Sequence, residues 1–444
     1  MGENGLKKIS AVILGCGNRG QAYADYSIYT PEELEIVAVI DINAHALENA
    51  MAKYHVSPQN AFKSLDEFLK AKISCDIVIN ATMDKVHYET SVALLKAGYN
   101  LLLEKPVTAN PGELLEIDRL SKENGCKVVV CHVLRYTPYF KAIKKLINSG
   151  KIGKIINIQA NEHVWVSHFI ESYVRGPWKS EKECGSGFLL AKSCHDLDMI
   201  CWLNNTTVPK AVSSFGERAL FVKENMPEGA TEYCYNCPHE KNCLYSAIKL
   251  HLEFAPMAFQ TYGALINELG KELSELTYED KLEYLKHSDY GKCAYIGNDL
   301  VDRQVVSISF ENGSMATFNM IGASARPDRY IHIIGTQGEI EGKISENAFV
   351  VRSIDRSEGN YRWVEETVDV SKLVIDNKYQ SHAGGDYGIM YDLVRYLNGT
   401  GDMLSLTTIE DSIYGHFCVY EAEKSRKIGQ VIDFKEFMQK ERKE

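Results

Sequence analysis

The feature that most constrains the fold is a glycine-rich turn directly after an apolar run near the N-terminus. In "KISAVILGCGNRGQAYADY", Gly15, Gly17 and Gly20 form G-x-G-x-x-G between a strand-like run and a helix start. Such glycines permit a tight turn and close backbone approach to a pyrophosphate. Asp41 ends the next strand-like run, 21 residues after Gly20, where a carboxylate can accept both adenosine ribose hydroxyls. The pattern predicts a dinucleotide site that prefers NAD to NADP, although Arg19 could pair with a 2′-phosphate.

The first 135 residues alternate short apolar runs with helical patterns. "LEIVAVIDIN", "CDIVINAT", "NLLLEKP" and "KVVVCHV" have the composition of buried strands, and helix-like segments separate them. Buried strands that alternate with helices form a parallel, doubly wound sheet. We therefore predict an α/β protein in which residues 1–135 form a Rossmann domain.

The rest of the chain has longer runs of alternating polarity. "GKIINIQANEHVWV", "RQVVSISFENGSMATFNMIG" and "RYIHIIGTQGEIEGKI" contain turn signals such as "ENGS" and "TQGE". These patterns indicate antiparallel strands. Residues 136–444 are predicted to form an α+β domain with a mostly antiparallel, open-faced sheet and a cysteine-bearing insertion at about 217–300. Because "VVSISFENGSMATFNMIG" has apolar residues in both registers, we expect its open face to be covered in a homodimer or homotetramer.

Charge and composition exclude several classes of partner. The 444 residues carry a net charge of −11 and no basic cluster interleaved with aromatic residues, which argues against nucleic acid and anionic membranes as partners. No apolar run reaches the roughly 18 residues of a membrane helix, and the N-terminus lacks the apolar core of a signal peptide. We expect a soluble cytoplasmic protein with reduced cysteines.

One group of cysteines differs from the others, which lie in apolar contexts. "YCYNCPHEKNC" holds Cys234, Cys237 and Cys243, and Cys293 could be a fourth ligand. Four thiolates would form a closed tetrahedral zinc site that stabilises the insertion. Only the first pair has the usual ligand spacing, so an iron–sulfur cluster and free thiols remain alternatives. A metal here is predicted to be structural.

The apolar stretch "LLAKSCHDLD" carries four titratable groups. If it begins a helix, Lys192, His195 and Asp196 lie on one face, and Asp198 follows three residues after the histidine. Histidine suits proton transfer because its pKa of about 6.5 lies near working pH. Nearby lysines would lower that pKa and stabilise a developing alkoxide. The alternative is that His195 and Asp198 cap or cross-link a structural helix.

Five motifs together resemble the glucose–fructose oxidoreductase / inositol dehydrogenase superfamily, Gfo/Idh/MocA. They are "GCGNRG", "NATMDKVH", "EKP", "VLRYTPYF" and the helix with His195 and Asp198, and they span roughly the first 200 residues. The resemblance implies a Rossmann domain, a second α/β domain and a cofactor between them. The implied substrates are sugars, cyclitols or their derivatives.

The resemblance also implies roles for particular residues. Lys105 would contact substrate and the nicotinamide ribose, and His195 would be the acid/base residue, with Lys192 and Asp198 as further catalytic candidates. The implied cofactor-binding residues outside the three glycines and Asp41 are Asn18, Arg19, Thr82, His87, Glu104, Lys105 and Arg135.

The chain departs from the family pattern at one position. Relatives often have an aspartate four residues before the histidine, and here that position is Ala191, followed by Lys192. Asp196, Asp198 or Lys192 would then have to orient or tune His195, or the chemistry differs.

Further polar residues could line a polyol pocket, because carbohydrates are bound by dense hydrogen bonding and an aromatic face. The candidates are Arg175, Trp178, Asp196 and His382. For Arg175 a surface or inter-subunit contact is an equal alternative.

Two reactions fit these residues. The first is NAD-dependent oxidation of a secondary hydroxyl of a sugar, glycoside or cyclitol. The second, known for some relatives, is a redox-neutral glycosidase that oxidises C3, eliminates the glycoside, adds water and reduces the ketone. A non-catalytic NAD-sensing protein is a third possibility, against which the intact "EKP" and His195 argue.

Overall fold

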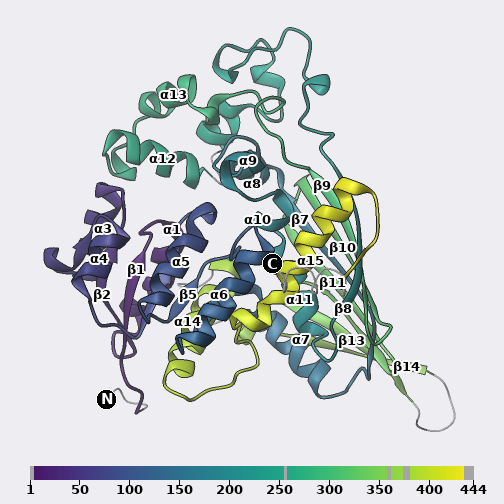
Figure 1. Ribbon diagram of the computed structural model, residues 1–444. Coiled ribbons are helices and arrows are strands. Elements are labelled where there is room, and N and C mark those ends of the chain that lie inside the picture. The colour runs from purple at the N-terminus through teal and green to yellow at the C-terminus, as the bar shows by residue number, and fades with distance from the viewer. Residues whose placement is uncertain (1–4, 255–257, 356, 358–361, 374–380, 435–444) are drawn as a thin grey trace.

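The computed structural model places two sheets side by side (Figure 1). The residues described are 5–254, 258–355, 357, 362–373 and 381–434. The first sheet has six strands in the order β3-β2-β1-β4-β5-β6, and all its pairs are parallel. The second has nine strands and is antiparallel except where β10 pairs with β7. The predicted fold class is confirmed.

The first sheet is assembled from short strands and the helices between them. Its strands are β1 (Ile9–Leu14), β2 (Leu34–Ile40), β3 (Ala61–Phe62), β4 (Ile77–Asn80), β5 (Leu101–Leu103) and β6 (Val128–Val130). Its helices are α1 (Asn18–Ala24), α2 (Tyr26–Tyr29), α3 (Ala44–Tyr54), α4 (Leu65–Ala71), α5 (His87–Lys96) and α6 (Pro111–Glu123). Because helices cover both faces, the strands are almost entirely apolar and buried.

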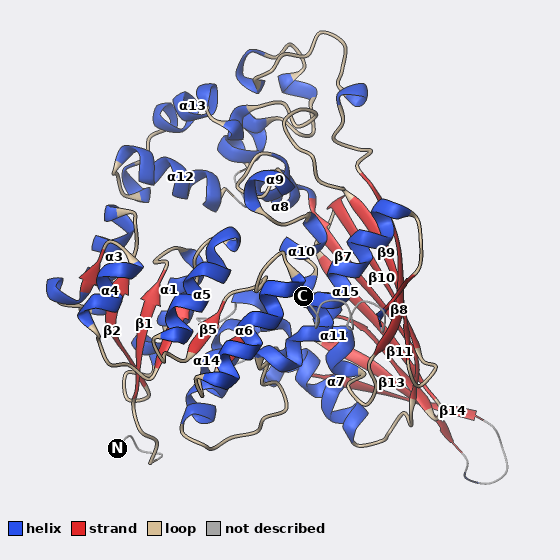
Figure 2. Ribbon diagram, viewed as in Figure 1, coloured by secondary structure: helices blue, strands red, loops and turns tan. Residues whose placement is uncertain are grey.

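The second sheet is built from longer strands. They are β7 (Ile155–Trp165), β8 (Pro209–Glu217), β9 (Arg303–Phe310), β10 (Met315–Ser324), β11 (Asp328–Gly335), β12 (Gly338–Lys343), β13 (Ala348–Asp355), β14 (Arg362–Asp369) and β15 (Ile432–Asp433). The helices of this half are α7 (Pro138–Asn148), α8 (Val166–Phe169), α9 (Glu181–Cys184), α10 (Phe188–Ala191), α11 (Cys194–Leu203), α12 (Phe259–Leu269), α13 (Tyr278–His287), α14 (Gly385–Leu397) and α15 (Ile409–Ile428). Helices cover one face of the sheet, where α7, α11 and α15 lie (Figure 2).

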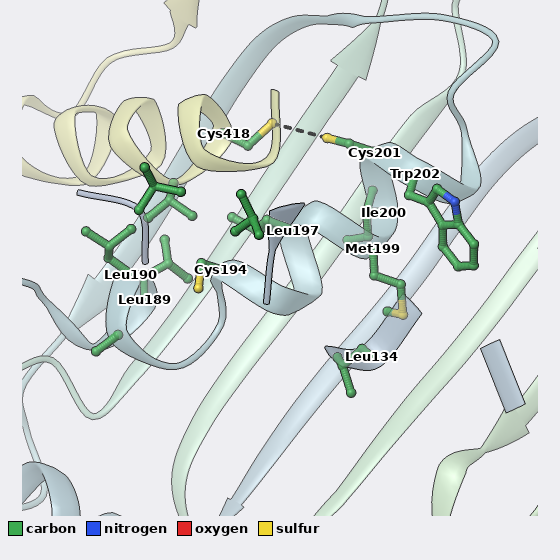
Figure 3. Close-up of a cluster of buried hydrophobic side chains, with 14 of the residues drawn as sticks. Leu134, Leu189, Leu190, Cys194, Leu197, Met199, Ile200, Cys201, Trp202 and Cys418 are labelled. Carbon is green, nitrogen blue, oxygen red and sulfur yellow. Dashed lines mark hydrogen bonds between the residues drawn. The ribbon is translucent and has the colours of Figure 1, made fainter. Parts of the chain in front are cut away.

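Helix α11 is buried along its whole length. It lies between the second sheet and α15, where Leu197 and Ile200 belong to the main apolar core (Figure 3). Cys201 of α11 faces Cys418 of α15, with 3.8 Å between the sulfurs. This packing fixes the orientation of the helix, and so fixes where its titratable side chains point.

Helix α14 returns from the C-terminal half to the first sheet. Its residues Ile389, Met390 and Leu393 are buried in the same apolar cluster as Ile13 and Ile79 of β1 and β4. The two sheets lie on either side of residue 135 in the sequence, but α14, which follows that residue, packs against the first sheet (Figure 1).

Residues 217–300 form a separate lobe of loops and short helices beyond the sheets (Figure 2). The lobe has a small apolar core of its own around Ala247, Leu265 and Leu285. All twelve cysteines are free thiols. No helix in the described part of the chain combines the length and apolarity needed to cross a bilayer.

Candidate active site

The glycine turn between β1 and α1 forms a cradle that side chains would fill. Gly15 has φ +92°, and a Cβ there would lie 2.5 Å from the carbonyl oxygen of Ala81. A side chain at Gly20 would collide with the carbonyl of Gly15, whereas a Cβ at Gly17 would meet open space. The turn is thus tightly packed on the protein side and open where a pyrophosphate would approach, as a dinucleotide requires.

Asp41 is held next to this turn by the backbone. One carboxylate oxygen accepts from the amide of Cys16 at 2.7 Å and the other from the amide of Asn43 at 2.7 Å. Each oxygen keeps further acceptor capacity for ribose hydroxyls. Asn18 is exposed at the start of α1, beside the same turn.

Arg19 joins the glycine turn to both halves of the molecule. Its guanidinium donates to Glu104 at 2.7 Å, to Asp386 of α14 at 2.6 and 3.1 Å, and to the hydroxyl of Tyr23 at 2.5 Å. His382 contacts Asp386 at 2.9 Å. We call these five residues the Arg19 cluster. Arg19 is paired with two carboxylates, so the predicted ion pair with a 2′-phosphate would require breaking those pairs.

The carboxylates of the Arg19 cluster are stabilised in their charged form. Burial alone would raise the pKa of Glu104, but the charges of Arg19 and Lys105 outweigh it and lower that pKa. Asp386 follows the same pattern, because His382 and Arg19 outweigh burial and lower its pKa.

Thr82 and His87 hold together the loops after β4 and β5. The imidazole of the buried His87 bonds to the carbonyls of Pro106 at 2.7 Å and Thr82 at 2.9 Å. The Thr82 hydroxyl donates to Asn80 at 2.9 Å. Both residues shape the rim of the predicted cofactor site, and His87 does so through the backbone.

Lys105 connects the "EKP" segment to the helix with the titratable groups. Its ammonium donates to the carbonyl of Ala191, the last residue of α10, at 2.7 Å. It is also, after burial, the largest influence that lowers the pKa of His195 well below the usual range. The structure therefore brings together Lys105 and His195, which are far apart in the sequence.

His195 is almost completely buried, with 7% of its surface exposed. Its Nδ1 finds no hydrogen-bond partner among the described residues. The imidazole lies edge to face with His132, with 5.5 Å between the ring centroids. A neutral imidazole results, since a positive charge here would be desolvated and would face Lys105.

A second group of charges includes Lys192 and Asp196. Lys192 lies 3.5 Å from Glu162, and Arg329 lies 2.8 Å from both Glu162 and Asp196. We call these four residues the Glu162 cluster. Burial raises the pKa of Asp196 to about 6 against the opposing charge of Arg329, and burial also lowers the pKa of Lys192.

Sequence reasoning missed Glu162 and Arg329. Glu162 occupies an inward position of β7, between the buried Ala160 and Val164, and Arg329 of β11 stands opposite it in the ladder. The inward register of a glutamate was the available signal, since a buried carboxylate needs a cation nearby. His168 of α8 also belongs here. It is half-buried, desolvation and then the charge of Lys192 act on it most strongly, and its pKa is lowered well below the usual range.

Arg135 and Asp198 are paired with each other. The guanidinium donates to both carboxylate oxygens, at 2.7 and 2.6 Å, and both side chains are buried. This bidentate pair joins α11 to the turn after β6. Each charge is neutralised by the other, and the assignment of Asp198 to catalysis and of Arg135 to the cofactor stays a prediction.

Arg175 and Trp178, the predicted substrate contacts, both have hydrogen-bond partners within the protein. Arg175 points into the insertion, where it donates to the carbonyls of Lys292 at 2.8 Å and Tyr245 at 2.6 Å. The indole of Trp178 donates to Asp84 at 3.1 Å. Both residues fasten loops around the site, and the sequence could not distinguish that role from contact with a polyol.

The four cysteines predicted as metal ligands line one cavity of the insertion. They are Cys234, Cys237, Cys243 and Cys293. Among the described residues, no three His, Cys, Asp or Glu side chains are already arranged to hold a metal ion.

A parallel sheet with a glycine cradle, followed by a second, mixed sheet, is typical of a two-domain dinucleotide-dependent oxidoreductase. Two family models match the chain. One, described as the oxidoreductase family with an NAD-binding Rossmann fold, covers residues 9–132, and the other, its C-terminal alpha/beta domain, covers residues 144–433. The chain belongs to the Gfo/Idh/MocA oxidoreductase family.

Individual relatives are distant. The oxidoreductase YteT of Bacillus subtilis is 21% identical over 402 residues, which cover 86% of this chain and 88% of YteT. The NADP-dependent scyllo-inositol 2-dehydrogenase IolW of the same organism is 25% identical over 213 residues, 48% of this chain and 56% of IolW. The structure of a levoglucosan dehydrogenase with NADH and levoglucosan has a TM-score of 0.67 and 15% identity, and the match covers 96% of this chain and 99% of that one.

Proposed function

We propose that the protein is an NAD-dependent dehydrogenase that oxidises a secondary hydroxyl of a sugar, glycoside or cyclitol. The observation that carries this proposal is the meeting of Lys105 with the segment of His195, beside the glycine cradle. The family and the cyclitol- and sugar-acting relatives support the substrate class.

The proposed proton chemistry needs only groups that are already in place. His195, kept neutral by burial and by Lys105, accepts the proton of the substrate hydroxyl. The ammonium of Lys105 donates to the same oxygen and stabilises its developing negative charge. NAD, when bound, supplies the hydride acceptor. We expect NAD to be preferred to NADP, because the charge of Asp41 would repel a 2′-phosphate.

The Glu162 cluster is the proposed binding site for the other hydroxyls of the substrate. Lys192 has one long ionic contact at 3.5 Å, and the Nδ1 of His168 has no hydrogen-bond partner among the described residues. Both can therefore bind a hydroxyl without breaking an existing short bond. Asp196 and His382 remain proposed substrate contacts at the edges of this region.

A redox-neutral glycosidase is the second candidate. The observation that favours it is the surplus of groups able to move a proton: besides His195 there are the neutral His168 and Asp196, whose pKa is about 6. Oxidation at C3, elimination, hydration and reduction require more proton transfers than oxidation alone.

One screen tests both candidates. Aryl glycosides and free polyols are incubated with the protein, with and without NAD, while NADH and released aglycone are followed together. Accumulating NADH supports the dehydrogenase, whereas aglycone release that needs NAD but leaves no NADH supports the glycosidase. A His195→Ala variant should bind NAD and lose turnover, and normal turnover would remove His195 from the mechanism.

We also propose a homodimer or homotetramer formed through the open face of the second sheet. Phe215, Val305, Met315 and Ile321 are exposed there on the adjacent strands β8, β9 and β10. Burial of these side chains would favour association, and a monomer in sedimentation would contradict it. The twelve free thiols support a reducing, cytoplasmic location.

A further inference from the structure

The insertion gathers four thiols from two separate stretches of chain around one small cavity. The cavity measures about 20 Å³ and is lined by Cys234, Cys237, Cys243 and Cys293. An antiparallel bridge between Tyr233 and Lys292 joins the two stretches, and the amide of Cys293 donates to the carbonyl of Glu232 at 2.7 Å. Extended backbone alternates its side chains, so Cys234 and Cys293 lie on the same side of this bridge.

The backbone around the thiols is folded into tight turns. Short 3₁₀ turns at Cys234–Asn236 and Glu240–Asn242 return the chain, and the amide of Cys237 donates to the carbonyl of Cys234 at 3.2 Å. The amide of Tyr245 donates to the sulfur of Cys243 at 3.4 Å. These turns bring the cysteine side chains of this stretch to the same cavity.

Arg175 places a positive charge against the thiols, and no carboxylate of the described residues pairs with it. The side chain is 2% exposed, and its partners are the carbonyls of Lys292 and Tyr245 and, at 3.7 Å, the sulfur of Cys234. Its Nη1 has no hydrogen-bond partner among the described residues. A buried cation without a counter-charge is costly. Four thiolates around a divalent metal ion carry a net negative charge and would balance it.

We propose that Cys234, Cys237, Cys243 and Cys293 bind one zinc ion in a closed tetrahedral site, with Arg175 as its counter-charge. The cavity has room for about one small guest, which favours a single ion over a four-iron cluster. The described side chains contain no ready three-ligand group, so the sulfurs turn toward a common point as the metal replaces their protons. A site closed by four protein ligands leaves no position for substrate, so its role is structural.

Bound zinc would stabilise the folded insertion. The lobe has only a small apolar core of its own, and small units of this kind gain much of their stability from a metal. Arg175 directly follows the segment with His168 and Tyr173, so the metal also fixes the wall of the substrate region.

The test is metal analysis of the full-length protein, purified without an affinity tag that binds metals. We expect about one zinc ion per chain, released when a mercurial titrates about four thiols. Cys237→Ser and Cys243→Ser should each lose most of the zinc. The matched control is Cys126→Ser, a partly buried cysteine of the first half, which should keep it.

Folding failure of the cysteine variants is addressed with the wild-type protein. Zinc is removed with a chelator and replaced by Co²⁺, and four sulfur ligands should give intense sulfur-to-cobalt charge-transfer bands. Absence of zinc before and after incubation with zinc under reducing conditions would overturn the proposal. So would iron with inorganic sulfide in its place, full zinc content in both serine variants, or a cobalt spectrum without sulfur ligation.

Discussion

Two partly buried charge clusters flank Lys105, and they differ in how many of their polar atoms already have hydrogen-bond partners. In the Arg19 cluster, the guanidinium donates through Nε and both terminal nitrogens to acceptors no farther than about 3 Å. In the Glu162 cluster, Lys192 has one contact at 3.5 Å, and the neighbouring His168 and His195 each have a ring nitrogen without a hydrogen-bond partner among the described residues. The first cluster joins parts of the fold, whereas the second retains free capacity to bind a ligand.

The same difference sets the pKa values of their carboxylates. Glu104 faces Arg19, Lys105 and the Tyr23 hydroxyl, and these outweigh burial and lower its pKa. Asp196 must share Arg329 with Glu162, so burial prevails and raises its pKa to about 6. Buried carboxylates of one molecule can thus serve as fixed charges or as titrating groups, according to how many cations each one faces.

The largest expected effect comes from Lys105, which lies between the clusters. Lys105→Met removes the charge that stabilises the alkoxide and keeps His195 neutral, and we expect kcat/KM to fall about 10³- to 10⁴-fold. Steady-state kinetics with a substrate found in the screen measures the loss, and NAD binding should stay within a few-fold. The exposed Lys85→Met is the matched control. Retained activity in Lys105→Met would end the proposed role.

The next prediction tests the comparison directly with two equivalent substitutions. Arg19→Met removes the guanidinium that donates to both Glu104 and Asp386, and we expect a loss of about 3–5 kcal/mol of stability. Arg329→Met leaves Glu162 with Lys192 nearby, so the stability loss should be smaller while turnover falls strongly. Chemical denaturation and kinetics on both variants separate the two effects. Equal stability losses, or activity lost only with Arg19→Met, would refute the distinction between the clusters.

Local signals were sufficient to predict the parallel sheet and the glycine turn from the sequence. The glycine spacing, the apolar strands and Asp41 are read within short windows, because turn geometry and strand burial depend on near neighbours. The pairing of Glu162 with Arg329 depends on the register of β7 against β11, and the return of α14 to the first sheet has no local signal. For Arg135 and Asp198, residue type and spacing cannot distinguish a buried ion pair from a catalytic charge.

Asp41, next to the glycine turn that bears Arg19, has acceptor capacity left for a ligand. Cofactor preference tests whether it contacts the ribose. Asp41→Asn keeps the shape of the side chain and one oxygen that can accept from a backbone amide. It removes the charge that would repel a 2′-phosphate. We expect the ratio of kcat/KM for NAD to that for NADP to fall about tenfold, which corresponds to about 1.4 kcal/mol. Asp66→Asn, on α4, serves as control. An unchanged ratio would mean that Asp41 does not face the ribose.

The smallest expected effect is the pH dependence contributed by Asp196. Its pKa rises from 3.8 to about 6 on folding, so the folded protein holds this proton more tightly than the unfolded chain does. The contribution of Asp196 to stability therefore falls as the pH rises from about 4 to about 6 and stays constant above that range. We expect about 1 kcal/mol, because Asp196 interacts strongly with Arg329, which spreads the transition. Comparing the denaturation of wild type and Asp196→Asn across this range isolates the effect. If the stability of the wild type relative to Asp196→Asn instead rises with pH, the sign is reversed and Arg329 prevails over burial. Asp196 would then be a fixed charge, like the carboxylates of the Arg19 cluster.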